Sequence, residues 1–195
     1  MSQGERIFDG RPEHVAPPPK MAVFIDGPYL SKTTESLGLR NRNMDYDWGK
    51  MLSWLKGKCN LVGAYLFTGL SFSASAQGFF RKIESLGYTV VQSRDNPVTD
   101  KVAPVDHQLL TDLCLLADSY QIATVVSGDG DFAYAIERLA RDLGKKVNIV
   151  AARNNTSMAL TALTKKYSGQ IRIFYLDDIH PSFVMRRIFN QATRR

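Results

Sequence analysis

TVVSGDGDF, residues 124–132, is the stretch of this chain that decides its fold. A run of β-branched residues ends abruptly in small residues and two aspartates, Asp129 and Asp131, and a helical pattern follows at once. Two carboxylates at the mouth of a buried strand repel each other unless a cation lies between them. A second strand-like run, MAVFI at 21–25, ends in the same way at Asp26 and Gly27. Two strands that each deliver a carboxylate at the carboxyl end indicate one shared acidic site.

Strand-like and helical patterns alternate through most of the chain. The strand-like runs are 21–26, 61–67, 88–92, 122–127, 146–150 and 171–176, and the helical patterns lie near 29–37, 45–57, 73–86, 105–119, 131–143 and 156–167. This alternation predicts a three-layer α/β fold, with a Rossmann-like parallel sheet and helices on both faces. Such sheets bind ligands beyond the carboxyl ends of the strands, where the strand order reverses. If strands 21–26 and 122–127 are neighbours there, their aspartates converge.

Length and composition indicate one domain with short tails. The chain has 195 residues, of which 44% are hydrophobic. Residues 1–20 read as a flexible leader that ends in three prolines, residues 21–178 as the domain, and residues 179–195 as a basic tail. The tail holds four arginines and no acid, within a net charge of +6. A basic tail suits a polyanion such as RNA or DNA, and the alternative is a solvated, partly disordered end.

The chain shows no signal for a membrane or for a cysteine framework. Its apolar runs are far shorter than the roughly 20 residues that span a bilayer, and the leader lacks the apolar core of a secretory signal. The two cysteines lie far apart, and no CxxC pair supports a zinc site. We therefore expect a cytoplasmic protein that has no membrane partner.

Two further aspartates lie on the predicted helix 105–119. Asp106 falls in its first turn, beside a long loop, from where it can reach the strand ends. Asp112 is six residues further on, about 240° around the helix, so the two do not share a face. Asp112 lies among leucines, and it is either a partly buried acid or a member of the site. For Asp26, Asp129 and Asp131 the alternative role is to cap the helix that follows.

A cluster of carboxylates favours magnesium or manganese, because these ions prefer oxygen ligands and offset the repulsion. Such an ion can lower the pKa of a water molecule and orient it for attack on a phosphate ester. The sequence offers no serine-histidine-acid pattern and no glycine-rich nucleotide loop as a competing scheme. A haloacid-dehalogenase-like site is excluded, because Asp26 is followed by Gly27 and Pro28 instead of a second aspartate two residues on.

The chain resembles the NYN domains, a branch of the PIN-like nucleases that includes the LabA-like bacterial proteins. The resemblance covers roughly residues 21–176. The matching segments are VFIDG at 23–27, Lys101 with Val105, Asp106 and Asp112, VSGDGDF at 126–132 and GKKV at 144–147. Either acidic segment alone is a weak signal, whereas both in this order are fairly specific.

The resemblance implies a PIN-type sheet, a Mg²⁺ or Mn²⁺ site, and hydrolysis of phosphodiester bonds in single-stranded RNA. Carried over by position, Asp26 and Asp129 are the principal metal ligands, and Asp106 completes the metal shell or positions the attacking water. Asp131 belongs to the same catalytic and metal-binding set, and Asp112 is a further candidate ligand.

Five residues are expected to contact RNA: Tyr29, Arg94, Lys101, Ser127 and Arg153. The Tyr29 ring stacks on an unpaired base or packs on the following helix. Arg94 and Arg153 lie just past strand ends, on the side of the carboxylates, as phosphate contacts or as solvated loop charges. Lys101 is a phosphate contact, and Ser127 hydrogen-bonds a carboxylate or a phosphate.

Three hypotheses follow for the function. The leading one is a Mg²⁺- or Mn²⁺-dependent ribonuclease. The alternative is a non-catalytic RNA-binding or regulatory protein, because Tyr29 stands where the family usually has asparagine. The third is an interaction module that forms a homo-oligomer through the C-terminal segment 182–189.

Overall fold

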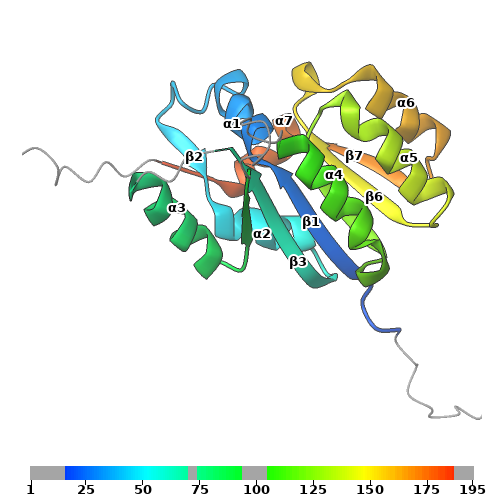
Figure 1. Ribbon diagram of the computed structural model, residues 1–195. Helices are drawn as coiled ribbons and strands as arrows, with labels where there is room; N and C mark the ends of the chain where they lie inside the picture. The colour runs from blue at the N-terminus through cyan, green and yellow to red at the C-terminus, as the bar shows by residue number, and fades with distance from the viewer. Residues whose placement is uncertain (1–15, 70–73, 94–104, 187–195) are drawn as a thin grey trace, which may run out of the picture.

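Six parallel strands form the central sheet of the computed structural model, which describes residues 16–69, 74–93 and 105–186 (Figure 1). The strand order is β4-β3-β1-β5-β6-β7. The strands are β1 (Lys20–Asp26), β3 (Asn60–Thr68), β4 (Thr89–Gln92), β5 (Ile122–Val126), β6 (Lys146–Ala151) and β7 (Ile171–Tyr175). All six predicted strands are confirmed. Strands β1 and β5 are neighbours at the point where the chain order reverses, which is the condition for their aspartates to converge.

Helices cover both faces of this sheet, so the predicted three-layer fold is confirmed (Figure 1). One face carries α4 (Val105–Leu115), α5 (Ala133–Arg141) and α6 (Met158–Lys166). The other face carries α1 (Gly27–Ser36), α2 (Trp48–Lys56), α3 (Ala74–Ser85) and the short α7 (Leu176–Ile179). Four 3-10 turns complete the helical elements: η1 (Ala117–Ser119), η2 (Gly130–Phe132), η3 (Arg153–Asn155) and η4 (His180–Phe183).

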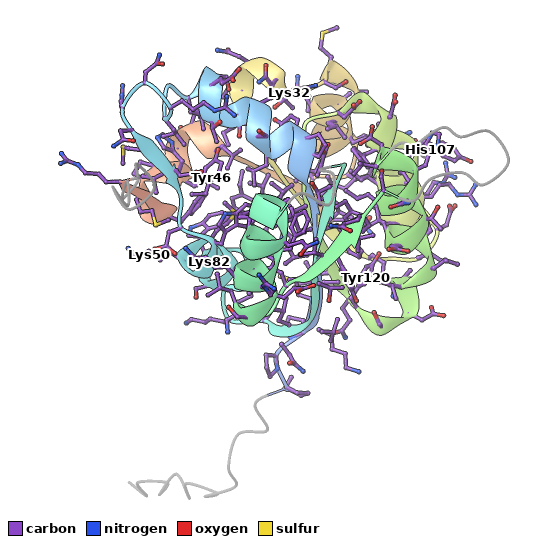
Figure 2. The ribbon with its side chains drawn as sticks, turned by 60° about the vertical axis from the view of Figure 1, so that its left-hand side comes forward. Lys32, Tyr46, Lys50, Lys82, His107 and Tyr120 are labelled. Atoms are coloured by element: carbon purple, nitrogen blue, oxygen red, sulfur yellow. The ribbon has the colours of Figure 1, made fainter. Side chains whose placement is uncertain are left out.

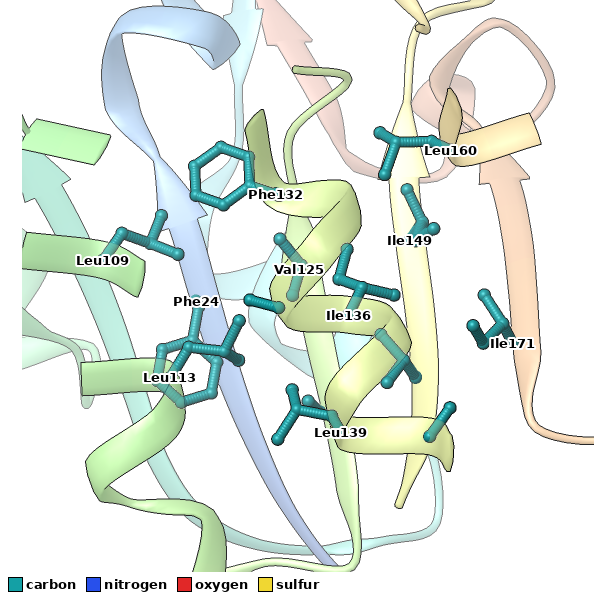
Figure 3. Packing of buried hydrophobic residues seen from close by; sticks show 14 of the residues in the cluster. Phe24, Leu109, Leu113, Val125, Phe132, Ile136, Leu139, Ile149, Leu160 and Ile171 are labelled. Carbon is teal, nitrogen blue, oxygen red and sulfur yellow. The ribbon is translucent and has the colours of Figure 1, made fainter. Parts of the chain in front are cut away.

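Strand β1 lies at the centre of the core because both of its faces are buried. Its side chains alternate: Ala22 and Phe24 pack beneath α4 and α5, whereas Val23 and Ile25 pack against the helices of the opposite face. Figure 3 shows Phe24 among leucines of α4 and α5, with Phe132 at the upper end of the cluster. A fully buried strand of this kind is held in one register, which fixes the position of the residue that follows it.

The C-terminal segment differs from the predicted tail. Strand β8 (Val184–Arg186) pairs antiparallel with β2 (Met44–Tyr46), and neither strand was predicted. Phe183 is fully buried, and its ring centroid lies 6.1 Å from that of Tyr46. Residues 183–186, which the sequence assigned to the basic tail, therefore pack against the domain through β2. The part of the predicted oligomer contact that is described, residues 182–186, packs on its own chain, and 187–189 lie outside the described residues.

Among the described residues, no helix is both long enough and apolar enough to cross a bilayer.

Candidate functional site

The site is built around Asp26, at the carboxyl end of β1. Ile25 pairs with Val126 in the register of β1 and β5, so the next residue of each strand, Asp26 and Ser127, emerges at the same edge. The Ser127 hydroxyl donates a hydrogen bond to Asp26 Oδ2 at 2.9 Å, and the Tyr29 backbone N–H donates to Asp26 Oδ1 at 2.9 Å. Asp26 therefore caps α1 and also joins β5. The alternative role of Asp26, as a helix cap only, does not account for its second hydrogen bond, to Ser127.

A chain of hydrogen bonds links Asp26 to the other predicted acids of β5. Ser127 Oγ accepts from the Asp129 backbone N–H at 3.2 Å, and Asp129 Oδ1 accepts from the Asp131 backbone N–H at 3.0 Å. Asp129 is thus the N-cap of η2, and Asp131 lies in the first turn that follows. Both carboxylates are exposed, whereas Asp26 is only 4% exposed. The arrangement places one buried carboxylate beneath two solvent-facing ones.

Burial raises the pKa of Asp26 above the usual value of aspartate. The hydrogen bonds from Tyr29 and Ser127 counteract this shift, and the negative charges of Asp106 and Asp129 add to it. Asp26 is therefore a carboxylate whose ionised form is disfavoured by its surroundings. A cation bound at this edge would relieve both the burial penalty and the repulsion.

Asp106 joins the same electrostatic cluster from α4. It is half-buried in the first turn of that helix, and its pKa is raised by burial and then by Asp129 and Asp131. His107 and Lys32 act in the opposite direction on Asp106. Figure 2 shows Lys32 on α1 and His107 on α4 at the upper end of the molecule, whereas Tyr120 lies toward the lower end. The structure therefore brings four predicted aspartates from three segments to one edge of the sheet.

Two glycines allow the backbone to close around these acids. A Cβ at Gly27 would lie 2.5 Å from the Phe67 carbonyl oxygen, and one at Gly128 would overlap the Asn155 carbonyl oxygen. Gly128 is buried, and its carbonyl accepts from the Ser157 N–H at 2.9 Å. Any side chain at either position would separate β1 or β5 from its neighbours, so the glycines fix the spacing of the site.

Tyr29 packs inward. The side chain is 9% exposed, and its hydroxyl accepts a hydrogen bond from the buried Ala152 N–H at 2.8 Å. Burial raises the pKa of Tyr29 to about 12. Of the two alternatives given by the sequence, the structure favours packing, because a ring enclosed to this degree has no free face for a base. Tyr29 thereby ties α1 to the carboxyl end of β6.

The other predicted RNA contacts have different outcomes. The sequence left open whether Ser127 hydrogen-bonds a carboxylate or a phosphate. In the structure its hydroxyl donates to the Asp26 carboxylate. Arg153 lies at the same edge, but it forms an ion pair with Asp178, and its guanidinium carbon lies 4.2 Å from the centroid of the Tyr175 ring. Arg94 and Lys101 lie outside the described residues.

Asp112 is not brought to the acidic edge. It lines a surface depression with four other residues of α4 and β4: Val91, His107, Gln108 and Thr111. It is also absent from the charges that shift the pKa values of Asp26 and Asp106. The 240° separation along the helix predicted this divergence from Asp106.

The donor set suits a hard divalent cation in kind, because it consists of carboxylate and hydroxyl oxygens. Within the described segments, no three His, Cys, Asp or Glu side chains lie close enough together to hold a metal ion. Asp129 and Asp131 are exposed, and Asp129 Oδ1 accepts the Asp131 N–H. The carboxylates of Asp26, Asp106 and Asp129 therefore match Mg²⁺ or Mn²⁺ in the chemical type of their oxygens alone.

Sequence reasoning missed Lys32 and Ser157. Lys32 is an exposed cation on α1, two turns after Asp26, and its charge reaches Asp106. Ser157 is the N-cap of α6, and its Oγ lies where a Cβ at Gly130 would come within 2.7 Å. The spacing between Asp26 and Lys32 could have indicated that Lys32 lies near the acids. This inference requires knowing that α1 begins at Gly27.

A parallel α/β sheet with an acidic edge at its β1–β5 switch point defines the PIN-like class of fold. A family model described as NYN domain matches residues 20–169, and the chain therefore belongs to the NYN domain family. Proteins of this family are generally nucleases or RNA-binding proteins.

Two individual proteins are similar to this chain. The low amplitude and bright protein LabA of Synechococcus elongatus is 28% identical over 161 residues, which cover 77% of this chain and 83% of LabA. The crystal structure of a protein of unknown function from Vibrio parahaemolyticus matches with a TM-score of 0.70 and 20% identity, over 90% of this chain and 99% of that one. The second similarity concerns the fold.

Proposed function

We propose that this protein is a Mg²⁺- or Mn²⁺-dependent ribonuclease that hydrolyses phosphodiester bonds of single-stranded RNA in the cytoplasm. The observation that carries the proposal is the buried Asp26 carboxylate, linked through Ser127 to Asp129 and electrostatically coupled to Asp106. A repelling group of carboxylates at a switch point is costly to maintain for structure alone. A bound cation, together with the phosphate that it binds, would offset the repulsion between these carboxylates.

In the proposed reaction, each residue of the site has a role that follows from its position. Asp26 is held rigidly by two hydrogen bonds and provides the fixed ligand, while the exposed Asp129 provides the adaptable one. Asp106 completes the metal shell or orients the attacking water from the first turn of α4. The charge of the exposed Lys32 on α1 acts on Asp106, and this side chain would contact a phosphate oxygen. A bound ion would supply the acidity of that water and offset the charge that develops on the phosphate.

The decisive experiment is cleavage of end-labelled single-stranded RNA with Mg²⁺, with Mn²⁺, and with a chelator. We expect cleavage that requires the metal and falls at least about 100-fold in D26N and D129N, as for loss of a group that stabilises the transition state. D118N serves as the matched control, because Asp118 is exposed in η1 after the far end of α4. Metal binding is followed separately by calorimetry with Mn²⁺. If wild type cleaves no RNA with either metal and D129N behaves identically, the proposed enzyme activity is refuted; equal cleavage by both would refute the assignment of Asp129.

D106N and D112N test the assignment within one helix. Asp106 lies in the acidic cluster and Asp112 lies in a separate depression, although both are half-buried on α4. We expect D106N to lose activity and D112N to keep it. The reverse result would show that the catalytic face of α4 has been assigned wrongly.

A second function, RNA binding without cleavage, is favoured by Tyr29. This residue replaces the polar side chain that the resemblance expects, and its hydroxyl is bound to Ala152 instead of facing the acids. RNA binding that weakens with salt, in the absence of any cleavage with either metal, would support this alternative.

A further inference from the structure

Two large apolar side chains are exposed beside the acidic edge. Tyr134, in the first turn of α5, is 69% exposed, and Met158, the first residue of α6, is 87% exposed. The opposite side of α5 packs Ile136 and Leu139 into the core. A single exposed apolar residue is ordinary, but two at the rim of one site indicate a surface that another molecule covers.

The register of α5 against α6 places the two side chains on the same stretch of surface. At one end, Ser157 packs against Gly130. Further along, Glu137 accepts hydrogen bonds from Lys166 Nζ and from the Tyr167 hydroxyl, both at 2.8 Å. Gly130, in η2, and Glu137, in α5, are thus two points of contact with α6, and Tyr134 lies between them at helical spacing.

Tyr134 is one helical turn after Gly130, and Met158 directly follows Ser157, so both exposed side chains adjoin the contact between Gly130 and Ser157. We call this pair the Tyr134–Met158 ledge. Tyr134 is also the (i, i+3) neighbour of Asp131, and such neighbours have Cβ atoms roughly 5–6 Å apart. The distance from the ledge to Asp131 is therefore comparable to the size of one nucleotide.

We propose that the Tyr134–Met158 ledge holds an unpaired base of RNA, one whose adjoining phosphate lies at Asp26 and Asp129. This proposal rests on the proposed function and adds a binding site to it. An exposed aromatic ring stacks on the face of any base, and a thioether packs readily against a flat ring. Arg138 adds a cation, because its guanidinium carbon lies 6.0 Å from the centroid of the Tyr134 ring.

The size of the ledge favours a base over a folded protein. A stable protein interface buries about 800 Å² on each partner. Two side chains cover far less than that, and the next residues along the same faces are charged, such as Glu137, Arg141 and Lys166. A base needs only one ring and the side chain next to it.

The test measures RNA affinity and cleavage for Y134A, Y134F and the control L143A. Leu143 is 53% exposed just beyond the other end of α5, so its loss is a matched truncation of an exposed apolar side chain. Affinity is measured by fluorescence anisotropy of a labelled 12-nucleotide RNA in Ca²⁺, and by repeating the titration with single abasic positions. Thermal unfolding of each variant checks the fold.

We expect Y134A to weaken binding about 5- to 100-fold, whereas Y134F and L143A keep the affinity of wild type. For wild type, one particular abasic position should weaken the affinity for RNA. For Y134A, the same abasic position should cause no further loss of affinity. In cleavage assays KM should rise while kcat stays near wild type, because the ledge does not touch the reacting atoms.

The outcomes separate the ledge from the nuclease activity. If wild type cleaves RNA and Y134A binds as tightly as wild type, the ledge is refuted and the proposed function stands. If binding depends on Tyr134 but no metal supports cleavage, the ledge stands and the nuclease is refuted. If wild type binds no RNA, both are refuted. If Y134A changes only the oligomeric state on sizing, the ledge contacts protein and the proposal is wrong.

Discussion

The substitution Y29F tests how the site is held together. Tyr29 Oη accepts the Ala152 N–H at 2.8 Å, and Ala152 is 2% exposed. Phenylalanine keeps the ring but leaves this buried amide without its acceptor, which costs about 1–3 kcal/mol of unfolding free energy. For a domain of this size, that corresponds to a fall of roughly 2–12 °C in the midpoint of thermal unfolding.

The assay is thermal and urea unfolding of Y29F, with Y134F as the control. The control removes a phenolic hydroxyl from an exposed ring, so its unfolding midpoint should match wild type. The urea m-value should be unchanged in both variants, since neither alters the surface exposed on unfolding. If Tyr29 instead stacked on a base, phenylalanine would preserve that role and the stability. An unchanged midpoint for Y29F would therefore refute the packing argument.

Three further predictions concern the glycine, the buried acid and the C-terminal segment. G128A should destabilise the domain by about 1–3 kcal/mol in urea, since its Cβ would overlap the Asn155 carbonyl; a midpoint equal to wild type would contradict this. Because Asp26 has a raised pKa when folded, its contribution to stability is fully present below the unfolded pKa and is lost as pH rises through the folded one. D26N keeps a capping side chain, so in metal-free buffer it should melt above wild type at pH 7 and converge with it in acid; a gap that is constant with pH would exclude this cause. F183A should lose about 3–5 kcal/mol, whereas a mere tail residue would lose almost nothing in the same unfolding assay.

The sheet could be predicted because its strands are uninterrupted apolar runs separated by helical patterns. Periodicity also located the ends of β1 and β5: Asp26 is the last residue of β1, and Asp129 and Asp131 lie in the turn that follows β5. Strands β2 and β8 could not be predicted in this way. Each has three residues, and their pairing joins positions that are about 140 residues apart, such as Asp45 and Met185.

The directions of individual side chains also could not be predicted from the sequence. The resemblance supplied a motif position for Tyr29, but only the packed structure shows that the ring points toward Ala152. Asp112 and Arg153 illustrate the same limit, because one faces another surface of α4 and the other is paired with Asp178. Such outcomes depend on tertiary neighbours, which a local pattern does not contain.

The bond between Asp26 and Ser127 joins positions that are 101 residues apart. During translation the first of them leaves the ribosome long before the second has been synthesised. The acids can gather only after β5 has docked beside β1, and a nascent chain that stops earlier has no complete centre. If the proposed ribonuclease activity is correct, this order of assembly would keep an unfinished copy from cutting the messenger RNA that encodes it.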